Sequence, residues 1–327
     1  MTTDAVVVRG LEKTYGDIQA VRGIDLTVAR GEVFGFLGPN GAGKSTTIKI
    51  LCTLASPTAG SATVAGYDVV KERDEVRASI GLVFQETTLD DYLSAYRNLL
   101  FHGELYDVPA NDLPKRIEEV MRMVGLWDRK DSAVATFSGG MKRRLEIARG
   151  LVHAPKVLFL DEPTIGLDPQ TRNGIWGYIR ELRKEHELTI FLTTHYMDEA
   201  ESCDRIAIMD AGKIVGEGSP EKLKASVAKD RVQLRTKDDA AAIAALKERF
   251  EIDAAIHEGQ IRFGVTSGEE FLPRLFSELG AGIVSVSVAR PTLDDVFLSF
   301  TGRAMRDAEA SAGERNLANP AFRQRRH

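Results

Sequence analysis

A stretch near the N-terminus combines glycines, a lysine and hydroxyl residues in an order that suits phosphate binding. Its members are Gly38, Pro39, Asn40, Gly41, Ala42, Gly43, Lys44, Ser45 and Thr46. Glycines let the backbone bend so that successive N–H groups point at one anion, and a helix that follows adds its positive dipole end. In such a loop Lys44 reaches the β- and γ-phosphates, and the Ser45 hydroxyl binds Mg²⁺. This phosphate loop, residues 38–46, therefore predicts a nucleoside triphosphate site, in preference to a Gly-rich turn that binds nothing.

Two carboxylates, Asp161 and Glu162, follow the apolar run 157–160 at the end of a predicted strand. Such a continuous run is typical of a strand buried on both faces, and ligands bind at the carboxyl ends of strands in open α/β sheets. Beside a phosphate loop, we expect Asp161 to contact Mg²⁺ and Glu162 to polarise an attacking water. An ordinary strand that ends in surface acids is the alternative.

A second glycine pair opens a helical pattern at Ser138, Gly139 and Gly140. Ser138 is predicted to cap the helix, and the glycines leave its positive end uncovered and able to bind an anion. From these three residues alone, a plain capped helix is the preferred interpretation.

Alternating short apolar runs and helical patterns place these motifs in an α/β domain. The expected strands include Ala5–Val8, Ile24–Val28, 33–37, Ile80–Phe84, Val157–Asp161, Thr189–Thr193 and Arg205–Asp210. The stretch 92–149 has helical periodicity and no strong strand signal, which predicts a helical insertion. The expected domains are residues 1–228, with a helical subdomain at about 88–150, and a small α+β domain at 229–302. Residues 303–327, rich in Ala, Glu and Arg, are expected to form a flexible tail.

Composition excludes several classes of function. The 327 residues carry a net charge of −5 and are 43% hydrophobic, so no basic field favours nucleic acid as the main partner. Cys52 and Cys203 have no metal-ligand spacing and are expected to be buried thiols in a reducing compartment. We expect no signal peptide, and no apolar run approaches the ~20 residues that span a bilayer.

The order of the motifs resembles that of the nucleotide-binding subunits of ABC transporters over residues 5–225. The order comprises the phosphate loop, Gln85, Ser138-Gly139-Gly140, Asp161-Glu162, Asp168 and His195. The resemblance implies a phosphate-loop ATPase fold that binds ATP and Mg²⁺. A GTPase or small-molecule kinase would leave Ser138-Gly139-Gly140 and His195 unexplained.

The resemblance also implies individual roles. Tyr15 matches the aromatic residue that stacks on adenine, and Gln85 matches the residue that meets the metal and water. Glu162 matches the general base, and His195 matches the histidine that bridges the γ-phosphate and that base. Asp168 matches a loop that crosses to the other subunit. Tyr15 could instead be a half-buried tyrosine near a strand end, and His195 could be a structural histidine. Asp168 could instead be a residue that initiates a turn.

A homodimer follows from the same resemblance. In this family the Ser-Gly-Gly helix of one subunit covers the nucleotide of the other, and this chain has one phosphate loop and one such helix. Met141 stands where the family often has Gln, which predicts weaker polar contact without loss of activity. The expected transport partner is an ABC-2-type permease in the membrane, with this chain at the cytoplasmic face.

The C-terminal end narrows the resemblance. The run 291–298 (Pro-Thr-Leu-Asp-Asp-Val-Phe-Leu), followed by Thr301 and Gly302, is similar to the end of daunorubicin-resistance-type ATP-binding subunits. That similarity implies export of a hydrophobic drug or lipid. The alternative is an ABC ATPase that acts on nucleic acid or the ribosome, although the chain lacks zinc-spaced cysteines and a second cassette.

Overall fold

A computed structural model describes residues 4–186, 188–227, 230–257, 260–279 and 282–302. The described chain forms two compact units, and the division falls between Gly218 and Ser219. The sequence analysis placed the end of the first domain later, at residue 228. The earlier division follows from α8 (Pro220–Val227), which contacts α11 (Leu293–Thr301) of the second unit. The expected flexible tail at 303–327 lies outside the described residues.

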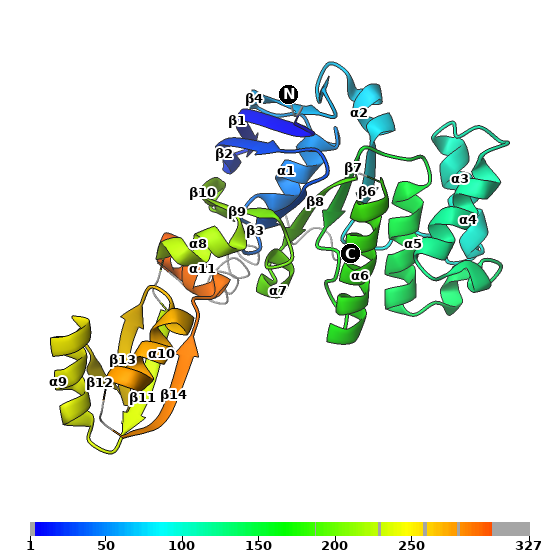
Figure 1. Ribbon diagram of the computed structural model, residues 1–327. Coiled ribbons are helices and arrows are strands. Elements are labelled where there is room, and N and C mark those ends of the chain that lie inside the picture. The colour runs from blue at the N-terminus through cyan, green and yellow to red at the C-terminus, as the bar shows by residue number, and fades with distance from the viewer. Residues whose placement is uncertain (1–3, 187, 228–229, 258–259, 280–281, 303–327) are drawn as a thin grey trace, which may run out of the picture. The chain divides into compact units, whose positions relative to one another are not determined.

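A six-stranded sheet forms the centre of the first unit (Figure 1). Its strands in spatial order are β10 (Lys213–Gly218), β9 (Arg205–Asp210), β3 (Val33–Leu37), β8 (Thr189–Thr194), β7 (Val157–Asp161) and β6 (Ile80–Val83). All neighbours pair in parallel except β10, which is antiparallel to β9. Every residue of β3, β7 and β8 is buried, which explains the apolar runs of β3 and β7 and the apolar centre of β8.

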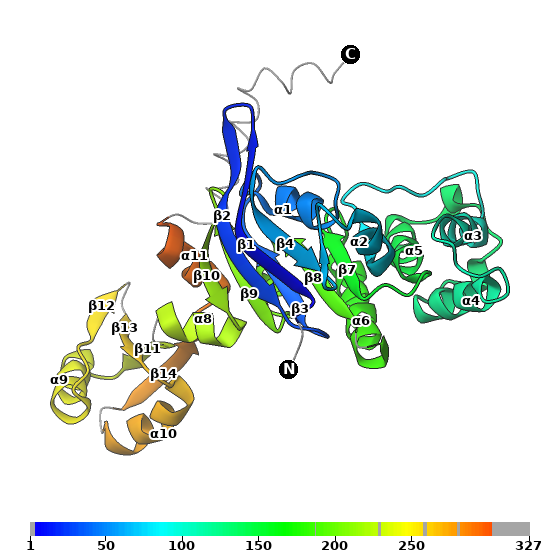
Figure 2. The ribbon, with the colours of Figure 1, turned by 90° about the horizontal axis from the view of Figure 1, so that it is seen from above.

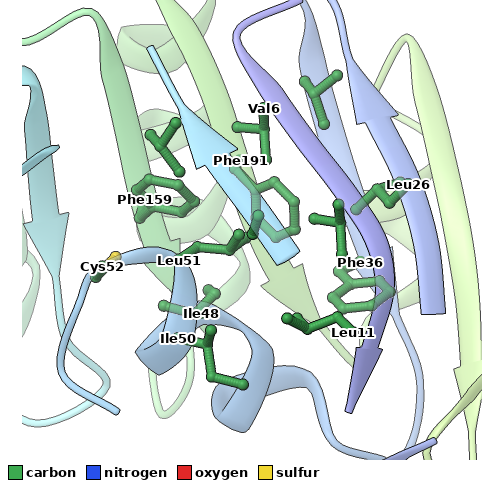
Figure 3. Packing of buried hydrophobic residues seen from close by; sticks show 14 of the residues in the cluster. Val6, Leu11, Leu26, Phe36, Ile48, Ile50, Leu51, Cys52, Phe159 and Phe191 are labelled. Atoms are coloured by element: carbon green, nitrogen blue, oxygen red, sulfur yellow. The ribbon is translucent and has the colours of Figure 1, made fainter. Parts of the chain in front are cut away.

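An antiparallel sheet lies beside the parallel one, in the order β2 (Ile18–Val28), β1 (Val6–Tyr15), β4 (Ala59–Val64) and β5 (Tyr67–Asp68). Helix α1 (Lys44–Leu51) contacts β2 and β4 of this sheet and β7 of the other. Figure 3 shows Ile48 and Leu51 of α1 packed with Phe159 and Phe191 in the resulting core. Apolar burial on both sides of α1 therefore fixes the helix that carries Lys44 and Ser45.

Helices cover the edge of the parallel sheet at β6 (Figures 1 and 2). They are α3 (Ala95–Leu105), α4 (Leu113–Met123), the 3-10 turns η1 (Trp127–Arg129) and η2 (Val134–Thr136), and α5 (Gly139–Leu151). Helices α3, α4 and α5 contact one another, and α5 also contacts β6. Three further helices complete the first unit: α2 (Arg73–Ser79), α6 (Pro169–His186) and α7 (Met197–Ala200).

The second unit contains a four-stranded antiparallel sheet in the order β12 (Ala255–His257), β13 (Gln260–Val265), β11 (Asp230–Thr236) and β14 (Ile283–Ala289). Helices α9 (Asp239–Phe250) and α10 (Gly268–Glu278) complete a β-α-β-β-α-β order. Alternate residues of the strands, such as Val232 and Leu234, pack with Leu246 of α9 and Leu275 of α10 in a separate core.

The predicted fold class, an α/β domain with a helical insertion and a small α+β part, is confirmed. The predicted buried state of Cys52 and Cys203 is also confirmed, and both are free thiols. Strands β4, β5, β10 and β12 were not among the expected strands, and β1 and β2 are longer than expected. Among the described helices, none combines the length and apolarity needed to cross a membrane.

Candidate nucleotide-binding site

The predicted motifs meet at one edge of the parallel sheet. Strand β3 leads into the phosphate loop, β7 ends at Asp161, and β8 is followed by His195. These three strands are neighbours in the order β3, β8, β7 and run in parallel, so their carboxyl ends share one edge. Gln85 lies just beyond β6, the next strand.

The phosphate loop takes backbone conformations that explain its glycines. Gly41 and Gly43 have φ values of 80° and 110°, in the region that favours glycine. At Gly38 a Cβ atom would collide with the carbonyl oxygen of Met209, and at Gly43 it would lie 2.5 Å from that of Ala20. Asn40 and Gly41 are exposed, while Pro39, Ala42 and Lys44 are buried and Gly43, Ser45 and Thr46 are partly buried.

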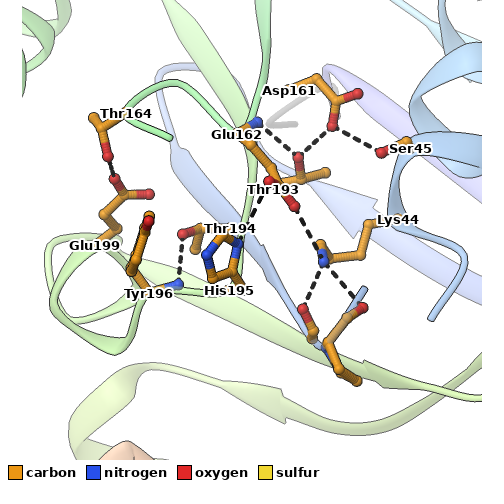
Figure 4. A network of polar contacts seen from close by, with 12 residues as sticks. Lys44, Ser45, Asp161, Glu162, Thr164, Thr193, Thr194, His195, Tyr196 and Glu199 are labelled. Atoms are coloured by element: carbon orange, nitrogen blue, oxygen red, sulfur yellow. Dashed lines mark hydrogen bonds and ion pairs between the residues drawn. The ribbon is translucent and has the colours of Figure 1, made fainter. Parts of the chain in front are cut away.

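Lys44 is the first residue of α1, and its side chain is almost wholly buried. Its Nζ donates to the carbonyl oxygens of Gly38 and Pro39 at 2.5 and 3.2 Å. It also lies 3.5 Å from Oε1 of Glu162 (Figure 4). The loop therefore wraps its own lysine and holds the cation beside a carboxylate from a different strand end.

Ser45 and Asp161 form a second contact between the loop and β7. The Ser45 hydroxyl donates to Oδ1 of Asp161 at 3.1 Å, and the same oxygen accepts from Thr193 Oγ1 at 2.6 Å. A hydroxyl beside a carboxylate is the kind of hard oxygen donor set that Mg²⁺ prefers. The pair therefore fits a Mg²⁺ ion, although the described residues contain no cluster of three or more Cys, His, Asp or Glu side chains suited to a metal.

Glu162 lies between Lys44 and His195 (Figure 4). Its φ of 48° is unusual for a residue with a side chain, and it is only 6% exposed. Nδ1 of His195 lies 3.4 Å from Oε2 of Glu162, a polar contact that is longer than a well-formed hydrogen bond. Burial alone would raise the pKa of Glu162, but interactions with His195 and Lys44 outweigh it and hold that pKa below its usual value. The side chain is thus kept as a carboxylate, as a base requires.

Two further predicted residues, Gln85 and Tyr15, have exposed side chains. Tyr15 ends β1 and is 47% exposed, with Nζ of Lys13 4.7 Å from its ring centroid. The ring is accessible, as stacking on a base requires.

The Ser-Gly-Gly motif begins α5, as the sequence predicts. Ser138 caps the helix by accepting from the N–H of Met141 at 3.3 Å, and both Ser138 and Gly139 are exposed. Asp168 is exposed and accepts from the N–H and hydroxyl of Thr171 at 2.9 and 2.6 Å. Those hydrogen bonds lower the pKa of Asp168.

Sequence reasoning missed several polar residues around the site. Thr193 binds Asp161, and its hydroxyl and carbonyl oxygens both accept from the N–H of Glu162. Arg143 of α5 donates to the backbone near both carboxylates. Arg143 was detectable: it lies four and seven residues before the buried Ile147 and Gly150, and so on the apolar stripe of its helix.

Comparison with known proteins agrees with this arrangement. A family model described as ABC transporter matches residues 21–165, and one described as ATP-binding protein DrrA1-3-like, C-terminal domain, matches residues 218–301. The daunorubicin resistance ATP-binding protein DrrA3 of Streptomyces coeruleorubidus is 41% identical over 95% of this chain and 100% of its own length. The linearmycin resistance ATP-binding protein LnrL of Bacillus subtilis is 38% identical over 91% and 98%. The Nod factor export ATP-binding protein I of Burkholderia lata is 38% identical over 91% and 97%.

Solved structures resemble a large part of this chain. CbiO1 of Clostridium perfringens, part of the ABC transporter complex cbiONQ, has a TM-score of 0.64 and 30% identity, over 76% of this chain and 96% of that one. A dimeric ATP-binding cassette bound to ADP and phosphate in a post-hydrolysis state has a TM-score of 0.59 and 30% identity, over 65% and 98%. The chain belongs to the ATP-binding subunits of ABC transporters, in the daunorubicin-resistance-type group, and is the ATPase of an ABC exporter.

Proposed function

We propose that the chain hydrolyses Mg²⁺-ATP at the edge of the parallel sheet and that two copies of it drive export through a separate permease. The observation that carries the proposal is the chain of contacts from Lys44 through Glu162 to His195, formed by residues from three different strand ends. It supplies a cation, a base and a histidine at one place.

In this proposal the phosphate loop and the N-terminus of α1 bind the phosphates. Lys44 exchanges its carbonyl partners for β- and γ-phosphate oxygens, since an oxyanion is a better partner for an ammonium group than a neutral carbonyl. Glu162, held as a carboxylate, accepts a proton from the attacking water while His195 bridges it to the γ-phosphate. Tyr15 stacks on the adenine ring.

Ser45 and Asp161 would hold the metal, with Gln85 joining them from the end of β6. When bound, Mg²⁺ neutralises charge on the β- and γ-phosphate oxygens. The exposed side chain of Gln85 leaves it able to reach the metal or to respond to a partner at the surface.

A homodimer supplies the remaining part of the site. Ser138, Gly139 and the first turn of α5 present N–H groups and a positive dipole end that are exposed in one chain. In the proposal they cover the γ-phosphate bound to the other chain, with Asp168 near the same boundary. One solved relative, a bacterial ABC transporter cassette, is described as dimeric in two structures, which supports this arrangement.

The proposed cargo is a hydrophobic drug or lipid, because relatives are named for resistance to daunorubicin and linearmycin and for export of Nod factor. The proposed permease is of the ABC-2 type and would hold the chain at the cytoplasmic face of the membrane. We propose that the permease contacts the helical insertion and segment 86–93. Tyr92 of this segment is 96% exposed, and Phe101 and Leu105 of α3 in the insertion are also exposed.

Purification from native membranes tests these assignments together. The tagged chain, trapped with ATP and vanadate, is expected to co-purify one integral membrane protein in stoichiometric amount. Tyr92→Asp should lower that yield, whereas Val70→Asp, at an exposed apolar residue outside the insertion, should not. Equal recovery with both variants would remove the proposed contact, and recovery of ribosomes or nucleic acid would overturn the export function.

A further inference from the structure

Arg143 is a buried charge that the proposed chemistry does not use. It belongs to the second turn of α5 and is only 7% exposed, and its partner Glu146 is 1% exposed. Nη1 of Arg143 lies 3.0 Å from Oε2 of Glu146. A buried ion pair contributes little to stability by itself, because taking two charges out of water offsets most of their attraction. The other contacts of Arg143 are therefore the more informative ones.

The guanidinium group donates to four backbone carbonyl oxygens from two separate segments. Nε donates to Pro163 at 2.5 Å, and Nη2 donates to Asp161 and Glu162, both at 3.2 Å. Nη1 donates to Phe84, the residue before Gln85, at 2.5 Å. Together with Glu146, these acceptors match the five fixed N–H donors of an arginine.

The same helix holds the far end of the segment that contains Gln85. Oε1 of Glu146 accepts from the N–H of Thr88 at 2.8 Å, and Nη1 of Arg149 donates to the Thr88 carbonyl oxygen at 2.8 Å. Segment 84–88 is thus bound at Phe84 and at Thr88 by side chains of α5.

Helix α5 is itself fixed against β6. A Cβ atom at Gly81 of β6 would collide with the carbonyl oxygen of Gly150, so the two backbones are in direct contact. His153 Nε2 lies 2.8 Å from the carbonyl oxygen of Ile80. A shift of segment 84–88 or of α5 is therefore transmitted to Arg143 rather than absorbed by loose packing.

We propose that Arg143 is a positioning residue that joins segment 84–88 to the backbone of Asp161, Glu162 and Pro163, so that the two segments move as one. Arg143 acts on Glu162 by donating to its backbone carbonyl oxygen. The positive φ of Glu162 persists only if the surrounding structure holds it, and this hydrogen bond is part of that structure. Glu146 orients the guanidinium group and binds Thr88. A permease that displaced segment 84–88, which contains the exposed Gln85, would in this way change the position of the Glu162 carboxylate. The inference rests on the base role proposed for Glu162.

Arg143→Lys is the first test, because lysine keeps the charge but cannot supply a planar fork of five donors. The kcat for ATP is expected to fall about 10- to 100-fold while KM changes little, since misplacement by about 1 Å costs that much. Hydrogen exchange of the full chain should accelerate together in peptides that cover 84–88 and 161–163. Glu146→Gln provides a second variant, with a smaller loss expected because it leaves an acceptor for Thr88.

Arg144→Gln is the matched control on the same helix. Arg144 donates to the Val124 carbonyl oxygen and to the Tyr178 hydroxyl, away from the carboxylates. The Arg144→Gln variant should have a lower melting temperature than the unchanged protein and the same kcat. The proposal is overturned if Arg143→Lys keeps kcat within about 2-fold, if only one segment loosens, or if Arg144→Gln reproduces the loss. Full turnover by Glu162→Gln would instead refute the proposed function, so the two failures are distinguishable.

Discussion

Ser45 and Asp161 are 116 residues apart in the sequence, yet the Ser45 hydroxyl donates to Oδ1 of Asp161 at 3.1 Å. The contact joins the first turn of α1 to the end of β7 across the edge of the sheet. Thr193 of β8 donates to the same oxygen at 2.6 Å, so three elements share one carboxylate atom. This oxygen cluster is the part of the site that is suited to a divalent cation.

Ser45→Ala should weaken nucleotide binding in Mg²⁺ and leave it nearly unchanged in EDTA, because only the metal-dependent part of affinity is lost. The expected loss of affinity in Mg²⁺ is about 10-fold, which corresponds to about 1.4 kcal/mol. Titration with a fluorescent ATP analogue in both buffers measures it. Thr47→Ala, which removes a hydroxyl that donates to the Gly43 carbonyl oxygen, is the control for helix damage. Equal losses in the two buffers would remove Ser45 from the metal role.

Glu162→Gln should abolish turnover and trap two chains around bound ATP. The amide keeps the size of the side chain but cannot accept the water proton, so hydrolysis stops while nucleotide binding persists. Light scattering after gel filtration with Mg²⁺-ATP should report a dimer for the variant and a monomer without nucleotide. Glu199→Gln is the control, because it also removes a buried carboxylate near the site but not the one proposed as the base. A monomer under all conditions, or unchanged turnover, would contradict the assignment.

The ionisation of Glu162 should depend on His195. The folded-state pKa is lowered, so this carboxylate contributes stability that is present above the unfolded pKa and lost as pH falls through the folded value. In His195→Ala, burial still raises the pKa while one of the two opposing partners is gone. The pKa of Glu162, and with it the acid transition of this carboxylate, should therefore move to higher pH.

Carbon-13 NMR of labelled glutamate side chains measures this shift, and the signal missing in Glu162→Gln identifies the residue. Replacement of His102, which lies outside the site with a pKa lowered to about 3 chiefly by burial, is the control. An unmoved titration of Glu162 in His195→Ala would show that Lys44 alone holds the carboxylate ionised.

Gly139→Ala separates folding from assembly. A Cβ atom at Gly139 would lie 3.7 Å from Leu167 Cδ2, an ordinary contact, so the chain should fold at least as stably as before. Alanine favours helix over glycine by up to about 1 kcal/mol. The methyl group would however occupy the exposed face proposed to meet the other chain's nucleotide. Melting temperature should be unchanged or higher, and ATP-dependent dimerisation and turnover should fall.

Gly140→Ala is the contrasting variant, because its Cβ would collide with the side chain of Thr171 within the same chain. It should lower the melting temperature as well as the turnover. If Gly139→Ala dimerises and hydrolyses ATP normally, the helix end does not cover the nucleotide.

The sequence by itself was enough for the parts whose cause is local. The buried strands of the parallel sheet, the cap at Ser138 and the glycines of the phosphate loop follow from unbroken apolar runs, capping chemistry and backbone freedom. The length of β1 could not be predicted from the sequence, because this strand mixes exposed and buried residues and its pairing with β2 shifts register three times. Strands of two or three residues, such as β5 and β12, carry too little pattern to be recognised.

Tertiary structure alone decided which residues complete the site. Arg143 and Thr193 reach the backbone or side chains of Asp161 and Glu162 only because α5 packs against β6, and β6 and β8 both pair with β7. The lowered pKa of Glu162 likewise depends on Lys44 and His195, which come from other strand ends. Contacts between residues far apart in the chain arise from the order of strands in a sheet, and local residue patterns do not encode that order.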